Sequence, residues 1–123
     1  MSSDTKTSGL SKEEKQRKFQ QQYNDFQETI NQLTEKINQL RGDYDEHTIV
    51  LDTLKKAPKD RNCYRMVGGV LISNTAEEAA QILETKAKNI VTALDNLSKE
   101  LVKTHKEFEK WKKDTGVKIV RTD

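Results

Sequence analysis

The sequence predicts a mainly α protein, a long antiparallel two-helix coiled coil whose helices are joined by a small β-hairpin. Two heptad-spaced rows of apolar residues, similar in length, occupy the two halves of the chain. A repeat of 3.5 residues keeps one side of a helix facing a partner helix. Hydrophobic residues make up only 33% of the 123 residues and charged residues 34%. This balance suits a solvated two-helix rod better than a globular core.

The first helix is expected over about residues 11–56. Ser11 followed by Glu14 forms a capping-box pattern, which satisfies free backbone N–H groups at a helix start. Residues at alternating spacings of four and three then form the first row, in which His47 is the one polar member. The other members are Phe19, Tyr23, Phe26, Ile30, Leu33, Ile37, Leu40, Tyr44, Leu51 and Leu54. Pro58 lacks the N–H that would continue the helix, so the helix must stop near it.

A β-hairpin is expected over about residues 61–73. Two glycines, Gly68 and Gly69, tolerate the positive φ of a two-residue turn. The flanking strand residues are largely apolar on both faces: Cys63, Tyr64, Met66 and Val67 before the turn, and Val70, Leu71 and Ile72 after it. A lone two-stranded sheet is marginal in water, and its edges invite further pairing.

Two interpretations of this hairpin remain open. In one, a single face of the hairpin packs on the end of its own coiled coil. In the other, the hairpin joins strands from other chains in a shared sheet or barrel. We favour the second interpretation because the narrow end of a two-helix rod cannot cover both faces. The protein is therefore expected to be a subunit of an oligomer.

The second helix is expected over about residues 75–114. Thr75 followed by Glu78 is a second capping box, and Thr115-Gly116 ends the pattern. The second row has one polar member, Thr104. Its other members are Leu83, Ala87, Ile90, Leu94, Leu97, Leu101, Phe108 and Trp111. Residues 1–10 are rich in Ser and Thr and are expected to be a disordered tail, which leaves residues 11–123 as a single coiled-coil domain.

Aromatic residues gather where the two chain termini are expected to meet. Five of the seven aromatics belong to the ends of the two rows there: Phe19, Tyr23, Phe26, Phe108 and Trp111. They are either ordinary row residues that stabilise a frayed end, or an adaptable apolar surface for a partner, since apolar groups rimmed by charge mark binding surfaces.

Charge and composition argue against several functional classes. Lys and Arg number 22 and Asp and Glu number 20, and the two signs are interleaved, unlike the clustered basic face of a nucleic-acid-binding protein. Cys63 is the only cysteine, so no zinc-ligand spacing exists. No run approaches the ~20 apolar residues of a membrane span. No catalytic constellation is evident, so we expect no enzyme, no cofactor, no metal, no nucleic acid and no membrane.

Three segments resemble the β-type subunits of prefoldin. They are DEHTIVLDTLK at the end of the first helix, NCYRMVGGVLI in the hairpin and KEFEKWKKD at the end of the second helix. The resemblance covers roughly residues 15–120. The hairpin segment followed by a capped heptad helix is specific to the family, whereas heptads alone are shared by many unrelated coiled coils.

The resemblance implies an ATP-independent co-chaperone of six subunits, here joined by two α-type and three further β-type partners in a β-barrel platform. It implies that the distal ends of the coiled coils hold unfolded actin and tubulin and pass them to the cytosolic group II chaperonin. By position, the assembly residues are Tyr64, Met66, Val67, Gly68, Gly69, Val70, Leu71 and Ile72, and the client-binding residues are Phe19, Tyr23, Phe108 and Trp111.

One competing function remains open, a structural or tethering coiled coil that sets the distance between two partners. A tether would continue its row with aliphatic residues or end in a specific docking motif. The expected location is cytoplasmic, with the nucleus as an additional location; both are reducing compartments, which a lone cysteine fits.

Overall fold

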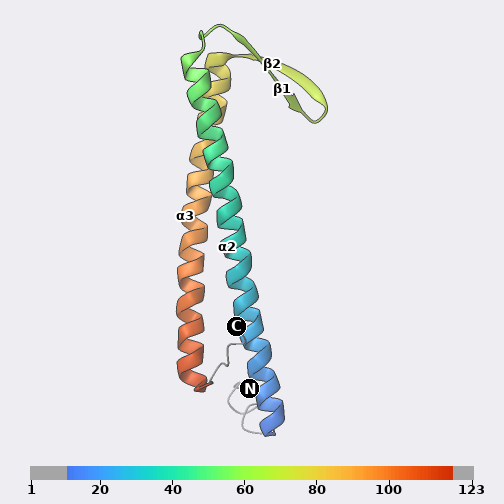
Figure 1. Ribbon diagram of the computed structural model, residues 1–123, viewed down its shortest axis with the longest axis vertical. Helices are drawn as coiled ribbons and strands as arrows, with labels where there is room; N and C mark the ends of the chain where they lie inside the picture. Colours follow the sequence, from blue (N-terminus) through green and yellow to red (C-terminus); the bar gives the residue numbers. More distant parts are fainter. Residues whose placement is uncertain (1–10, 118–123) are drawn as a thin grey trace. The chain divides into compact units, whose positions relative to one another are not determined.

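The computed structural model describes residues 11–117, so the tail expected over residues 1–10 lies outside the described residues. The chain forms helix α2 (Lys12–Lys56), strand β1 (Asn62–Val67), strand β2 (Val70–Thr75) and helix α3 (Ala76–Thr115) (Figure 1). The predicted order of helix, hairpin and helix is confirmed. The second strand reaches Thr75, two residues beyond the predicted end of the hairpin.

Two groups of residues pack internally, and each is described by itself. We call residues 35–98, which contain the hairpin and the adjoining parts of both helices, the hairpin unit. The described residues of the other group, 11–34 and 99–117, form the terminal unit. Each unit contains part of α2 and part of α3, so helix pairing recurs in both.

The two apolar rows form the interface between the helices in each unit. Every member of both rows is buried or half-buried. In the hairpin unit the least exposed row members are Ile37, at 6%, and Ala87, at 8%. Charged residues occupy the outer faces, which is the arrangement expected when a heptad stripe is the only apolar face of a helix.

The two polar members of the rows satisfy their hydrogen bonds within their own helices. Nδ1 of His47 lies 2.6 Å from the carbonyl oxygen of Asp43. The Thr104 hydroxyl is in a residue only 6% exposed and donates to the carbonyl oxygen of Glu100 at 2.9 Å. Because a buried polar group is costly only when it is unpaired, both residues fit an apolar row.

The start of α3 is held by the capping box that the sequence predicts. The backbone N–H of Glu78 donates to the Thr75 hydroxyl at 3.2 Å, and the backbone N–H of Thr75 donates to the Glu78 carboxylate at 3.0 Å. The Thr75 hydroxyl donates to the same carboxylate oxygen at 2.9 Å. These bonds from the backbone and side chain of Thr75 hold the pKa of the Glu78 carboxyl below its ordinary value, because they favour its charged form.

The segment between α2 and β1 folds back onto the start of α3. The backbone N–H of Ala76 donates to the carbonyl oxygen of Arg61 at 2.8 Å, and that of Glu77 donates to Lys59 at 3.2 Å. Ala76 is only 1% exposed. The first N–H groups of a helix have no partner inside it, so the carbonyls of this segment supply partners and join the ends of the two helices.

The hairpin is closed by the two glycines, as predicted. Gly68 has φ +56° and Gly69 has φ +82°, which are the two positive values of a type I′ turn. The register pairs Met66 with Leu71 and Val67 with Val70 on either side of the turn. Figure 1 shows the paired strands leaving the adjoining ends of α2 and α3 and projecting to one side of them.

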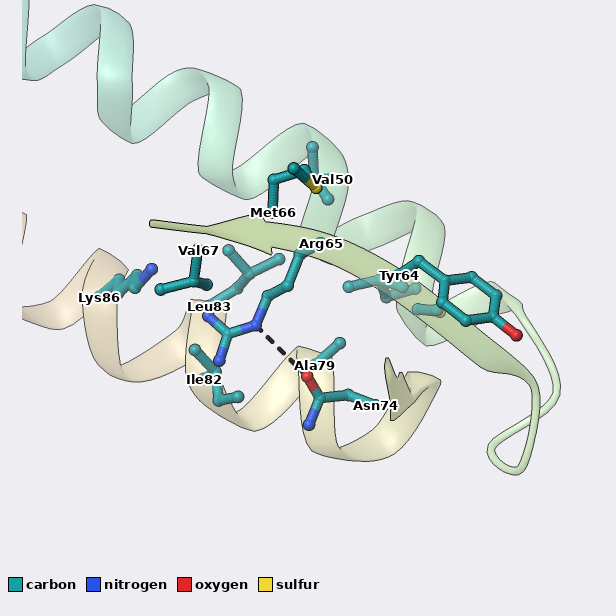
Figure 2. Close-up of a pocket in the computed structure, with 12 residues that line it drawn as sticks. Val50, Tyr64, Arg65, Met66, Val67, Asn74, Ala79, Ile82, Leu83 and Lys86 are labelled. Atoms are coloured by element: carbon teal, nitrogen blue, oxygen red, sulfur yellow. Dashed lines mark hydrogen bonds between the residues drawn. The ribbon is translucent and has the colours of Figure 1, made fainter. Parts of the chain in front are cut away.

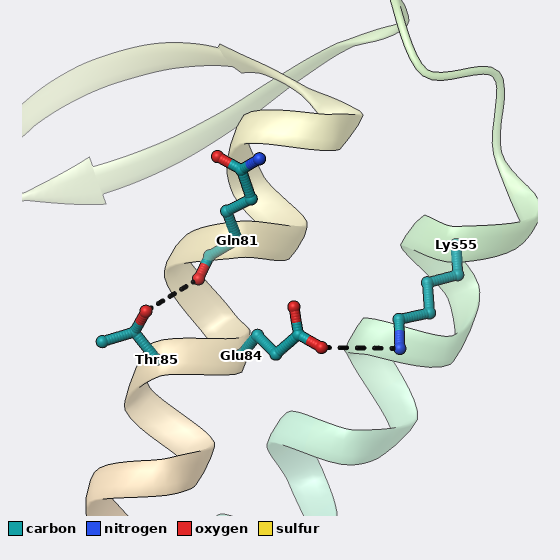
Figure 3. A network of polar contacts seen from close by, with 4 residues as sticks. All are labelled: Lys55, Gln81, Glu84 and Thr85. Carbon is teal, nitrogen blue, oxygen red and sulfur yellow. Dashed lines mark hydrogen bonds and ion pairs between the residues drawn. The ribbon is translucent and has the colours of Figure 1, made fainter.

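Polar contacts between the helices of the hairpin unit lie at the solvent-exposed surface. Nζ of Lys55 on α2 lies 3.9 Å from a carboxylate oxygen of Glu84 on α3, and about half or more of each side chain is exposed (Figure 3). The neighbouring Thr85 hydroxyl donates to the carbonyl oxygen of Gln81 within α3. Because an exposed ion pair contributes little stability, apolar burial holds this unit together.

Candidate functional site

The terminal unit contains an aromatic cluster built from both helices. Its members are Phe19, Tyr23 and Phe26 from α2 and Phe108 and Trp111 from α3. The ring of Phe108 has its centroid 5.2 Å from that of Phe26 and 5.7 Å from that of Tyr23. The ring of Trp111 is 5.7 Å from Phe26 and meets Phe19 edge-on at 6.4 Å. These distances lie in the range of favourable aromatic pairs.

The structure brings all four predicted client-binding residues together, but it does not expose them equally. Phe108 is only 5% exposed, and Phe19, Tyr23 and Trp111 are half-buried. Phe108 is therefore an interior residue of the helix pair in this arrangement, and the half-buried rings surround it. Their role in client binding stays a prediction, and it requires the rings to become more accessible than they are here.

A hydrogen bond joins the two helices inside the aromatic cluster. The indole Nε1–H of Trp111 donates to the side-chain carbonyl oxygen of Gln22 at 3.1 Å. Gln22 is a polar residue outside both apolar rows, so the heptad pattern does not single it out. The antiparallel register could have pointed to Gln22, because Gln22 directly precedes Tyr23, a row residue that lies opposite Phe108.

Positive charge lies over the edge of the aromatic cluster. Nζ of Lys112 is 4.4 Å from the centroid of the Phe108 ring and 2.8 Å from a carboxylate oxygen of Glu109. The cation–π contact covers the one ring of the cluster that is already buried. The long side chain of Lys112 thus separates Phe108 from solvent on this side.

The hairpin presents the second candidate surface, which is apolar and exposed. Five residues around the turn have exposed fractions between 46% and 66%: Tyr64, Met66, Val67, Val70 and Leu71. Gly68 and Gly69 are also exposed, whereas Ile72 is half-buried. An exposed apolar strand pair with free edges is a surface on which further strands pair.

A groove lies between the hairpin and the adjoining helix ends in the hairpin unit (Figure 2). Its volume is about 430 Å³, and its helix side includes Val50, Ile82 and Leu83. On the strand side, the Arg65 Nε–H donates to the side-chain oxygen of Asn74 at 3.3 Å. The hairpin therefore lies over the helix ends without packing tightly against them, and much of its apolar surface stays accessible.

Metal-ligand clusters and membrane-spanning helices are absent from the described residues. Between residues 11 and 117, no three His, Cys, Asp or Glu side chains gather as metal ligands would. No helix in this part of the chain is long and apolar enough to cross a membrane. Cys63 is half-buried, with a free thiol. The exposed hairpin and the aromatic cluster are the candidate functional surfaces, because both offer apolar area to a partner.

Comparison with known proteins connects this chain to one family. Residues 12–120 match the model of the prefoldin subunit family. The chain is 43% identical over 109 residues to Prefoldin subunit 2 of Saccharomyces cerevisiae, in an alignment that covers 89% of this chain and 98% of the yeast protein. It is 36% identical to Probable prefoldin subunit 2 of Schizosaccharomyces pombe, with 87% of this chain and 94% of that protein covered.

A more distant relative and a solved structure agree. The chain is 33% identical over 84 residues to human Prefoldin subunit 2, covering 68% of this chain and 54% of the human protein. The crystal structure of the prefoldin beta subunit from Thermococcus strain KS-1 superposes with a TM-score of 0.68 at 18% identity, covering 76% of this chain and 82% of that one. That likeness confirms the fold, and together with the sequence matches it shows that the chain belongs to the prefoldin subunit family.

Proposed function

We propose that this chain is the β-type subunit of prefoldin that corresponds to prefoldin subunit 2, and that it helps to hold unfolded proteins without ATP. The observation that carries the proposal is the 43% identity to the yeast protein over 98% of its length. The exposed hairpin and the aromatic cluster of the terminal unit give this role its physical basis.

Assembly is proposed to occur through the hairpin. Met66 and Leu71 lie opposite each other on one face and are 66% and 61% exposed. Strands of neighbouring subunits that pair with the free edges would complete the backbone hydrogen bonds. Closure of the shared sheet into a barrel would then remove one apolar face from water. The proposed partners are two α-type and three further β-type subunits, joined in a β-barrel platform.

Client holding is proposed to occur through the aromatic cluster. A non-native protein exposes apolar segments, and aromatic rings offer large apolar contact areas to them. Each contact made by one subunit is weak. Several subunits that contact one client together produce a high effective concentration and therefore a useful overall affinity. Release then needs no nucleotide, because each weak contact can be lost in turn.

The identity of clients and the place of action are part of the same proposal. Unfolded actin and tubulin are the proposed clients, the cytosolic group II chaperonin is the proposed recipient, and the cytoplasm is the proposed location. The proposed activity is binding without catalysis. These points come from the family resemblance.

Native mass spectrometry of the complex captured on this chain from its source cells tests the assembly step. The proposal predicts a particle of six small subunits, with this chain present alongside two α-type and three other β-type partners. A homodimer, or a complex with one large partner, would contradict the proposal and favour a tethering coiled coil.

A further inference from the structure

We propose that the hydrogen bond between Trp111 and Gln22 is a latch that holds the aromatic cluster closed. Gln22 then sets how readily the two helices of the terminal unit separate to admit an apolar segment of an unfolded protein. This inference rests on the proposed function, since it concerns the regulation of the proposed client-binding surface. Gln22 acts through Trp111 and is a positioning residue.

Burial of Phe108 at the centre of the cluster makes an opening step necessary before a client can contact this ring. Phe108 is 5% exposed, and its ring is in contact distance of Tyr23 and Phe26 on the opposite helix. A client side chain cannot reach the Phe108 ring while these contacts hold. The Phe108 ring is therefore held between the helices, and client binding to it must compete with the pairing of the helices.

The latch is directional, unlike the ring contacts around it. Trp111 and Gln22 lie 89 positions apart in the sequence, and their side chains are partly buried. Indole N–H is a donor only, and it needs an acceptor wherever water is excluded. Apolar rings can slide over one another, whereas this bond is satisfied in one register of the two helices. Opening breaks it and returns both groups to water.

The strength of one such hydrogen bond suits reversible opening of the helix pair. A hydrogen bond that is exchanged for bonds to water has a small net effect, so its loss should increase the open population by roughly two- to tenfold. That change is large enough to alter client capture and small enough to leave the helices paired for most of the time.

The test uses the complete hexamer reconstituted with variants of this chain. Gln22→Ala removes the acceptor. Gln21→Ala is the matched control, because Gln21 undergoes the same change on an exposed face and its amide donates only within α2, to Asp25. Gln22→Glu keeps an acceptor oxygen and should restore the latch. Opening is measured by hydrogen exchange of peptides from residues 12–34 and 99–115, and client capture by suppression of aggregation of chemically denatured actin.

A double-mutant cycle with Trp111→Phe distinguishes an effect of the hydrogen bond from an effect of general packing. Gln22→Ala should speed exchange of these peptides by about two- to tenfold and lower the hexamer concentration needed for capture, while Gln21→Ala and Gln22→Glu stay near the parent. In the Trp111→Phe background, Gln22→Ala should add no further change.

Three results would overturn the inference, in distinguishable ways. Equal exchange in the Gln22→Ala and Gln21→Ala hexamers, or an undiminished effect in the Trp111→Phe background, would show that there is no latch, while the proposed client binding would stand. Faster exchange without any change in client capture would show that clients do not bind through this cluster. It would also count against the proposed client-binding surface.

Discussion

The centroid of the Phe108 ring lies 5.2 Å from that of Phe26 on the opposite helix, and Phe108 is the least exposed residue of the aromatic cluster. The same cluster is the proposed contact for unfolded proteins. Under the proposed function, one set of side chains has two roles that compete, since it stabilises the helix pair when closed and would bind apolar segments when open.

Truncation of Phe108 should loosen the terminal unit more than truncation of Phe19. Phe108→Ala removes a buried ring and should cost on the order of 3–5 kcal/mol of local stability. Phe19→Ala removes a half-buried ring and should cost less. Hydrogen exchange of peptides from residues 12–34 and 99–115 in the assembled complex measures both changes. Equal protection in the two variants would contradict the interior position of Phe108.

A negative charge on the hairpin should prevent assembly. Leu71→Asp would place an unpaired carboxylate in the proposed shared sheet, at a cost of several kcal/mol. Val102→Asp is the matched control, because Val102 is 53% exposed but lies on α3 in the terminal unit. Native mass spectrometry should show a hexamer with Val102→Asp and none with Leu71→Asp. A normal hexamer with Leu71→Asp would rule out the hairpin as the assembly surface.

Replacement of Gly42 should stabilise the protein. Gly42 lies inside α2, and a Cβ added there would meet no atom within 4 Å. Because Gly is about 1 kcal/mol less favourable than Ala in a helix interior, Gly42→Ala should raise the unfolding free energy by about that amount. Gly69→Ala should lower it, since Gly69 has φ +82°. Denaturant unfolding measures both, and a loss of stability with Gly42→Ala would contradict the uninterrupted helix.

The capping box at α3 should make stability depend on pH in the acidic range. The pKa of Glu78 is lowered in the folded protein by its hydrogen bonds from Thr75. The stabilisation is therefore complete above the ordinary pKa of a carboxyl and is lost as pH falls through the lowered value. The stability difference between the parent and Glu78→Gln should be largest near neutral pH and shrink on acidification. A difference that stays constant with pH would contradict a charged cap.

The main elements could be predicted because each has a strong local signal. The heptad rows predicted both helices and the residues at their interface, including the polar positions at His47 and Thr104. Gly68 and Gly69 predicted the turn, and Pro58 predicted the end of α2. In each case residues close in the sequence determine the backbone, so no knowledge of distant contacts was needed.

The details of the candidate sites depend on contacts between distant residues and could not be predicted in the same way. The row pattern placed Phe108 in the cluster but did not show that it is the most buried ring, because that depends on how Tyr23 and Phe26 pack around it. Gln22 belongs to no apolar row. The groove beside Val50 depends on the angle at which the hairpin leaves the helices, and no sequence signal sets that angle.

Site-specific photo-crosslinking in the assembled hexamer tests the central claim most directly. A photoreactive phenylalanine analogue would replace Phe19 of the aromatic cluster in one variant and Lys88, an exposed residue of α3 in the hairpin unit, in the other. Illumination with chemically denatured actin should yield adducts from position 19 and few or none from position 88. Equal yields, or adducts from position 88 alone, would contradict client binding by the terminal unit.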